Sequence, residues 1–237
     1  MKVAGSEMLD FVVDENVQIH GGNGFVRDYA AERHYRDARV NRIFEGTNEI
    51  NRLLVPGMLA RRAVKGTLPL IAAAKALQEE LLAPPSMSSA STEDLGAERA
   101  LVAGMKKAAL AILGTAMQTY GEKMGDEQEV LSFASDAITD AFIAESALLR
   151  ALQARTDDGG RVALHDAAAK VVIHTAASRV EASCKEALAA MAKGDMLRTL
   201  MAALKRWLKS VPADLVAARR ALAQETIAKK KYVFDIV

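Results

Sequence analysis

The chain has 237 residues and a formal net charge of +1, and 51% of its residues are hydrophobic but only 5% aromatic. This length suits one large domain or two small ones, and the abundance of alanine and leucine without β-branched alternation predicts an all-α fold. Because acidic and basic residues are interspersed and nearly cancel, nucleic acid is not an expected partner.

The first predicted element is a helix over residues 2–17, followed by a glycine turn. The apolar residues at helical spacing are Val3, Met8, Phe11, Val12 and Val17, and Gly21-Gly22 ends the helix. Three acids, Asp10, Asp14 and Glu15, interrupt these apolar residues. The stretch therefore does not predict a secretory leader.

A short charged helix is predicted over residues 30–38, and an acid placed before Gly-Thr follows it. In that tract Glu45 precedes Gly46, which has no Cβ and so leaves space beside it. Thr47 can cap the next helix, whose N-terminal amides favour an anion.

The helix after this cap is predicted over residues 48–64. Pro56 is expected to kink it, because proline cannot donate to the hydrogen-bond ladder. The residues expected on its buried side are Leu53, Leu54, Met58 and Leu59.

Residues 18–52 as a whole resemble a signature of the acyl-CoA dehydrogenase family, flavoenzymes that introduce a double bond between the α and β carbons of a fatty acyl-CoA. The matching positions are Gln18, Gly21, Gly22, Gly24, Phe25, Asp28, Arg33 and Asp37, followed by the tract from Phe44 to Ile50. Ala30 departs from the family, which commonly has proline there.

The resemblance implies a role for each matching residue of the site. Glu45 becomes the base that removes the α-proton, and Gly46 leaves room beside the acyl-CoA substrate. Thr47 and Glu49 are expected near the FAD. Gln18 and the Gly21-Gly22 turn resemble a segment that reaches the FAD of a neighbouring subunit, so a homo-oligomer is implied. An electron-transferring flavoprotein is the implied electron acceptor.

Residue types alone leave other interpretations open. Glu45 is then a first-turn acid that complements a helix dipole, and the glycines are a turn between helices. The charged residues Arg33, Arg36, Asp37 and Arg39 are then a solvated, ion-paired face. On this view the chain is a non-catalytic helical module for oligomerisation or interaction.

The resemblance also predicts how the chain is organised. Residues 1–66 correspond to the end of the family's C-terminal helical domain, 67–94 to a short helix at 70–82 with a linker, and 95–237 to an additional C-terminal helical bundle. The family's N-terminal helical domain, β domain and first two bundle helices have no counterpart, so the chain is expected to be inactive alone. The implied location is the cytoplasm of a bacterium or, alternatively, the mitochondrial matrix or inner-membrane surface.

In the last part of the chain we predict helices over 95–124, 127–154, 161–192, 194–209 and 213–230, which favour an antiparallel bundle. Their breaks are Gly125-Asp126, residues 157–160, Gly194 and Pro212. Ser135-Asp136 and the stretch 145–150 resemble the extra domain of the very-long-chain branch of the family.

Neither a metal site nor a membrane-spanning segment is predicted. His165 and His174 lack the spacing of a helical metal pair, and no stretch reaches about 18 uncharged apolar residues. The only cysteine, Cys184, is expected to be a small buried residue. A basic trend that includes Lys205, Arg206 and Lys209 surrounds Trp207 as an interfacial aromatic. It leaves peripheral membrane contact open, although a solvated helix face is the preferred interpretation.

Overall fold

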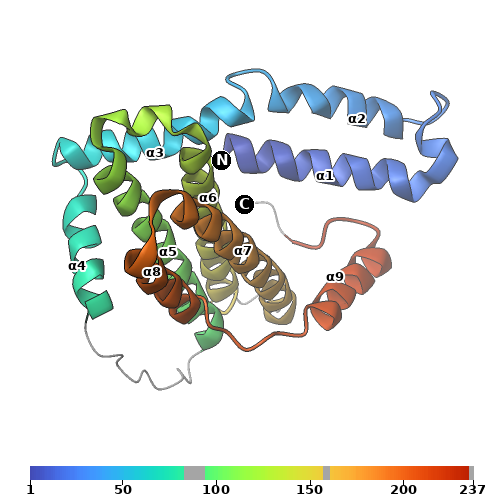
Figure 1. Cartoon of the computed structure of the whole chain (residues 1–237). Helices are drawn as coiled ribbons and strands as arrows, with labels where there is room; N and C mark the ends of the chain where they lie inside the picture. The colour runs from blue at the N-terminus through green and yellow to red at the C-terminus, as the bar shows by residue number, and fades with distance from the viewer. Residues whose placement is uncertain (83–93, 157–160, 235–237) are drawn as a thin grey trace.

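The computed structural model describes residues 1–82, 94–156 and 161–234, and every regular element in these ranges is helical (Figure 1). The α-helices are α1 (Lys2–His20), α2 (Ala31–Arg39), α3 (Asn48–Val64), α4 (Leu70–Leu82), α5 (Gly96–Tyr120), α6 (Gln128–Gln153), α7 (Val162–Met191), α8 (Gly194–Trp207) and α9 (Leu215–Lys229). The 3-10 helices are η1 (Gly21–Gly24), η2 (Val40–Arg42) and η3 (Gly121–Asp126). The all-α prediction is confirmed. The predicted linker after α4 and the break at 157–160 lie outside the described residues.

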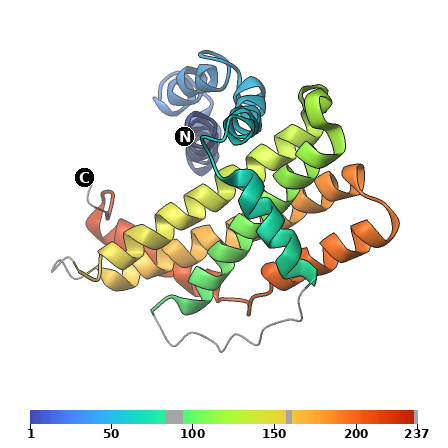
Figure 2. The same cartoon turned by 90° about the vertical axis from the view of Figure 1, so that its left-hand side faces the viewer.

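The centre of the molecule is a bundle in which α5, α6 and α7 pack against one another, with α8 against α5 and α7 (Figure 2). The contact surfaces alternate large residues such as Met105, Ile112 and Ile173 with fully buried alanines such as Ala134 and Ala176. Small residues let the helices approach closely while the large ones fill the space between them. The bundle predicted from residue 95 onward is therefore present, and the alanine-rich composition explains its tight packing.

Helix α8 corrects the interpretation of Trp207 as an interfacial aromatic. Leu200, Ala203, Leu204 and Trp207 lie three or four residues apart and are all buried, so the indole belongs to the apolar face of an amphipathic helix. Its helix is packed against α5, where Gly104 meets the backbone of Trp207 so closely that a Cβ would collide with the carbonyl oxygen. The aromatic part of the membrane-contact argument is thus removed.

Within the described part of the chain, the segment Gly96–Asp126 is long and apolar enough to cross a membrane by length and composition. Its best window has a mean hydropathy of 1.4, and 56% of that window is buried inside the molecule. Such burial is what the central helix of a bundle requires, and α5 occupies that position. Cys184 on α7 lies in the same core and is 1% exposed, as expected for a small buried residue.

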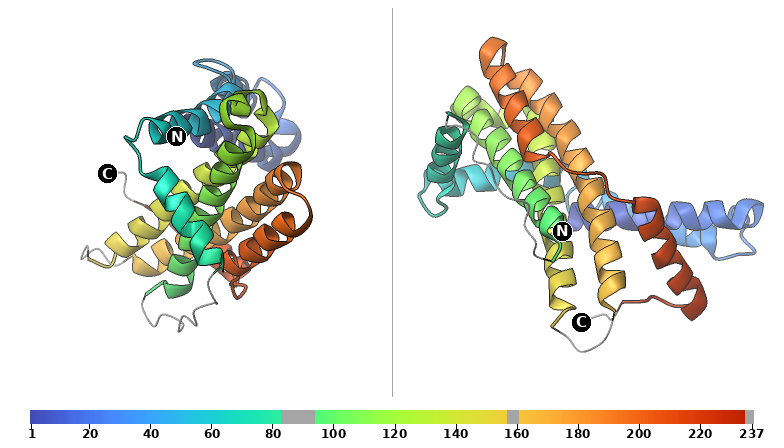
Figure 3. Two further views of the ribbon diagram at one scale, coloured as in Figure 1. Left: turned by 60° about the vertical axis from the view of Figure 1, so that its left-hand side comes forward. Right: turned by 90° about the horizontal axis from the view of Figure 1, so that it is seen from below.

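Helices α1 and α2 form an antiparallel pair that extends beyond the bundle (Figure 3). Gly21 ends α1 with a φ of 58°, which confirms the predicted stop at the glycine turn. Gly24 is buried against the carbonyl of Val17 and has no room for a Cβ. The pair and the segment that joins its helices expose many large apolar side chains, among them Met8, Phe11, Ile19 and Phe25.

Helix α3 connects this pair to the bundle, and its buried face differs from the one predicted. Leu54 and Met58 are about half exposed, at 51% and 49%, and that part of the prediction is wrong. The buried residues of α3 are instead Asn48, Pro56, Ala60 and Ala63. Small residues lie inside because this face packs closely on α6 and α1. The helix continues through Pro56, and the kink there stays a prediction.

Candidate functional site

The turn before α3 holds two consecutive residues in the left-handed region of backbone space. Glu45 has a φ of 55° and Gly46 a φ of 79°. Glycine adopts this conformation freely, whereas a residue with a Cβ is disfavoured there by about 1–2 kcal/mol. Strain of this kind persists only where the surroundings hold it, and it gathers at functional sites. Glu45 is exposed, and within the described residues its carboxylate has no hydrogen-bond or ion-pair partner.

Thr47 caps α3, as the sequence predicts. Its Oγ1 accepts a hydrogen bond from the backbone N–H of Ile50 at 3.3 Å. The neighbouring Glu49 is exposed in the first turn. Hydrogen bonds from its own backbone amide and from the Thr47 hydroxyl lower the pKa of Glu49. The helix therefore begins with backbone amides, a hydroxyl and a carboxylate gathered at one end, and Thr47 and Glu49 accept hydrogen bonds from two of these amides.

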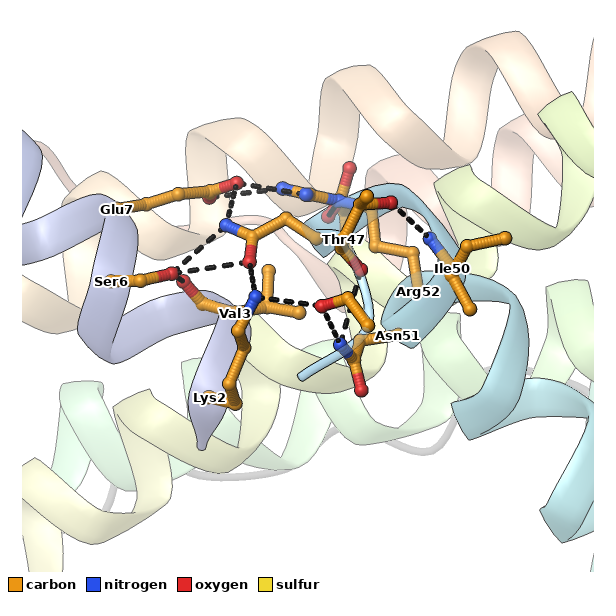
Figure 4. A network of polar contacts seen from close by, with 11 residues as sticks. Lys2, Val3, Ser6, Glu7, Thr47, Ile50, Asn51 and Arg52 are labelled. Atoms are coloured by element: carbon orange, nitrogen blue, oxygen red, sulfur yellow. Dashed lines mark hydrogen bonds and ion pairs between the residues drawn. The ribbon is translucent and has the colours of Figure 1, made fainter. Parts of the chain in front are cut away.

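The backbone of the turn is held by two side chains from different helices (Figure 4). Asn51 Nδ2 donates to the carbonyl oxygens of Gly46 at 2.6 Å, Thr47 at 3.1 Å and Glu45 at 3.3 Å. Lys2 Nζ on α1 donates to the same Gly46 oxygen at 2.9 Å. The turn that carries Glu45 is thus bonded both to its own helix and to α1.

Asn48 is the buried polar centre beneath this turn. It is 1% exposed, and its Oδ1 accepts from Lys2 Nζ at 2.7 Å and from Ser6 Oγ at 3.2 Å. Its Nδ2 lies 2.9 Å from Ser6 Oγ and 3.2 Å from Glu7 Oε1. A buried amide with its hydrogen bonds satisfied fixes one arrangement of its neighbours, so Asn48 sets the position of α3 on α1.

Arg52 links this network to the C-terminal bundle. Its guanidinium donates to Glu7 Oε2 on α1 at 2.9 Å and to Asp136 Oδ1 on α6 at 2.7 Å. The hydrogen bond to Glu7 raises the pKa of Arg52 above its ordinary value. Burial raises the pKa of Asp136, and the opposing effect of Arg52 is smaller. One side chain therefore joins α1, α3 and α6.

The structure separates the predicted site residues into two groups. Glu45, Gly46, Thr47 and Glu49 lie together at the end of α1 that carries Lys2. Gln18 is exposed at the other end of α1, about 24 Å away at 1.5 Å rise per residue, next to the exposed Gly21-Gly22 turn. Both groups are accessible, and the α1 helix holds them apart.

Sequence reasoning missed the residues that support the turn: Lys2, Ser6, Asn48, Asn51 and Arg52. The available signal was the concentration of amide and basic side chains in the first turns of α3, where apolar residues were expected to face inward. Nothing in the spacing indicated that Lys2 and Ser6 would meet Asn48, or that Arg52 would meet Glu7 and Asp136, across more than 40 residues of sequence.

Two family models, each described as the C-terminal domain of acyl-CoA dehydrogenase, match residues 1–81 and 104–206. A probable acyl-CoA dehydrogenase of Bacillus subtilis is 42% identical over 234 residues, which make up 98% of this chain and 39% of that protein. A crystal structure of an acyl-CoA dehydrogenase from Bacillus anthracis complexed with FAD has a TM-score of 0.93 and 41% identity, over 98% of this chain and 40% of that one.

A third relative is the caffeyl-CoA reductase-Etf complex subunit CarC of Acetobacterium woodii. It is 41% identical over 61 residues, which are 26% of this chain and 16% of that protein.

Both family models describe the C-terminal domain of acyl-CoA dehydrogenases, and the helical fold of the described residues agrees with that description. The two models together match most of the chain, and it belongs to the acyl-CoA dehydrogenase family. The chain spans about two fifths of the length of the relatives it matches along its whole length.

Proposed function

We propose that this chain contributes the base to an acyl-CoA dehydrogenase that removes hydrogen from the α and β carbons of a fatty acyl-CoA. In this reaction the Glu45 carboxylate takes the α-proton as the β-hydrogen leaves as hydride, and a double bond forms between the two carbons. FAD, when bound, accepts that hydride. A carboxylate serves as base here when water is excluded and the thioester carbonyl is held by hydrogen bonds that acidify the α-carbon.

The observation that carries this proposal is the left-handed conformation of Glu45 directly before the N-terminus of α3. A glutamate in the first turn of a helix complements the helix dipole with its backbone in the right-handed conformation. That role therefore does not require a left-handed backbone. The strain is supported by hydrogen bonds from Asn51 to the surrounding carbonyls. In this conformation the Glu45 carboxylate is exposed, so that a substrate can approach it.

The donors around Glu45 fit FAD in chemical type. The first amides of α3 and the Thr47 hydroxyl can donate to phosphate or flavin oxygens, and Glu49 can accept from a hydroxyl group. The 24 Å or so between these residues and Gln18 with Gly21-Gly22 supports assigning the second group to the FAD of a neighbouring copy. A homo-oligomer is therefore part of the proposal.

The bundle from α5 onward is proposed to be the additional domain of the very-long-chain branch. The separate family model over residues 104–206 supports an added unit of the same enzyme class. An electron-transferring flavoprotein is the proposed electron acceptor, supported by the naming of the Acetobacterium woodii relative as a subunit of an Etf complex. The proposed compartment is the cytoplasm or the mitochondrial matrix.

The test is a visible absorption spectrum after incubation with FAD and gel filtration, followed by anaerobic addition of a long-chain acyl-CoA. The test uses a longer protein, one that contains this chain and has the length of the relatives it matches. We expect its bound flavin to bleach, and its Glu45→Gln variant to retain flavin while bleaching at least about a hundredfold more slowly. Bleaching at the normal rate by Glu45→Gln would remove Glu45 as the base.

The alternative function is a non-catalytic module for oligomerisation or interaction. The exposed apolar residues of the α1–α2 pair favour it, because such patches mark contact surfaces. Failure of the longer protein to retain flavin, together with an oligomer in light scattering, would support this alternative.

A further inference from the structure

We propose that Asn51 is a positioning residue for Glu45, a role that rests on the proposed function of Glu45 as the base. Its side-chain amide holds the backbone of the Glu45-Gly46-Thr47 turn in the left-handed conformation, and this fixes the direction in which the carboxylate projects. The residue acts through the turn and touches no reacting atom.

The geometry of the amide supports this role. A single nitrogen, Asn51 Nδ2, lies 2.6–3.3 Å from three successive carbonyl oxygens, those of Glu45, Gly46 and Thr47. Three carbonyls can point at one donor only if the backbone curls around it, which a left-handed pair of residues accomplishes. The shortest of the three contacts is to Gly46, the residue directly after the proposed base.

Gly46 has no side chain, and this leaves room for the Asn51 amide. A Cβ on Gly46 would lie 3.0 Å from Asn51 Nδ2, a tighter approach than most side chains tolerate. The absence of a Cβ therefore lets the amide reach the carbonyls. The combination of Gly46 and Asn51 is needed for the curled turn, whereas a glycine alone would leave the turn free to change conformation.

Lys2 on α1 also holds the turn by a hydrogen bond. Its Nζ donates to the Gly46 oxygen and to Asn48 Oδ1, which is itself bonded to Ser6. The Gly46 carbonyl thus keeps one partner when Asn51 is removed. We therefore expect substitution of Asn51 to loosen the turn without unfolding α3.

The experiment measures backbone order at residues 45 and 46 by ¹⁵N relaxation in the purified chain. The variants are Asn51→Leu, which removes both donors, and Asn51→Asp, which keeps the shape but has no N–H to donate. We expect the order parameters of Glu45 and Gly46 to fall from about 0.85 to below about 0.6 in both variants.

The matched control is Asn41→Leu. Asn41 Nδ2 also donates to a backbone carbonyl, that of Ala38 at 3.0 Å, but it does not contact the turn. Its removal should leave the order of residues 45 and 46 unchanged. Unchanged order in both Asn51 variants would overturn the proposal.

A kinetic measurement in the flavin-containing longer protein separates positioning from a structural role. We expect both Asn51 variants to lower kcat about tenfold with little change in KM, because the base is displaced while substrate contacts remain. A changed KM with normal kcat would contradict positioning. If the wild-type protein does not reduce its flavin, the proposed function fails, and the relaxation result still decides whether Asn51 holds the turn.

Discussion

Arg52 Nε donates to Asp136 Oδ1 at 2.7 Å and so connects the helix that follows the Glu45 turn to the C-terminal bundle. The same guanidinium pairs with Glu7 on α1. Helix α3 is thereby tied to elements on both sides of it. The position of α3, which follows the Glu45 turn, therefore depends on Asp136 of the bundle as well as on local sequence.

Replacing Asp136 by asparagine should change the pH dependence of stability. Because burial raises the pKa of Asp136 above 3.8, its stabilising contribution is complete below that value and is lost as pH rises through the folded-state pKa. The asparagine side chain of the variant would remain neutral throughout. We therefore expect the free energy of unfolding of Asp136→Asn to increase relative to that of wild type as the pH rises above about 4.

Urea titrations at several pH values check this expectation. The control is Asp195→Asn, which alters an exposed pair with Arg198 on α8. The free energy of unfolding of Asp195→Asn should differ little from that of wild type, because surface ion pairs contribute little to stability. A constant difference between Asp136→Asn and wild type across this pH range would contradict the argument.

Replacing Glu45 by glycine should stabilise the chain while removing the proposed base. Relief of the left-handed backbone favours the variant by about 1–2 kcal/mol, and the greater freedom of glycine in the unfolded chain opposes it by about 0.4–1 kcal/mol. We expect a net gain of up to about 1.6 kcal/mol in urea unfolding.

Lys230→Gly is the matched control, since Lys230 also has a positive φ, 51°, at the end of α9. It should give a similar gain in stability and leave flavin reduction unchanged. A loss of stability in Glu45→Gly would show that the carboxylate contributes to folding.

Replacing Gly104 by alanine should destabilise the bundle. The new methyl group would collide with the carbonyl of Trp207, which belongs to backbone and cannot move aside cheaply. We expect a loss of about 2–3 kcal/mol in the free energy of unfolding, as for overpacked cores.

Gly57→Ala provides the comparison, because Gly57 lies inside α3 with nothing within 4 Å of the added Cβ. There the better helix propensity of alanine should stabilise by about 0.5–1 kcal/mol. Equal effects of the two substitutions would contradict the close contact between α5 and α8.

Cys184 should react with thiol reagents only after the bundle opens. It is 1% exposed, and burial raises the pKa of its thiol to about 12. At pH 8 we expect alkylation roughly a thousandfold slower than in urea, because the thiolate fraction falls with the raised pKa. Mass spectrometry of iodoacetamide-treated protein measures the rate. Rapid labelling of the native chain would show that α7 is not packed as described.

The helices were predictable because their ends carry local signals. Gly21 stops α1, Thr47 starts α3, and the element 70–82 was placed as the structure has it. These signals act within a few residues of each helix end and need no knowledge of distant partners.

The choice of buried face was less predictable. Leu54 was expected inside and is exposed, whereas Asn48 is buried, because hydrogen bonds from Ser6 and Lys2 satisfy its amide. Trp207 was placed at the surface from its basic neighbours, although its spacing from Leu200 and Leu204 decides its position. Glu45 was chosen as the candidate base from its motif, but its backbone conformation and its contact with Asn51 depend on geometry that the motif does not encode.

The Arg52–Asp136 pair spans 84 residues, which has a consequence for how the chain forms during translation. At about 5–20 residues per second, Arg52 is synthesised roughly 4–17 seconds before Asp136. During that interval the turn bearing Glu45 lacks its anchor on the bundle. The order of synthesis thus places the completion of the candidate site after the emergence of α6 from the ribosome.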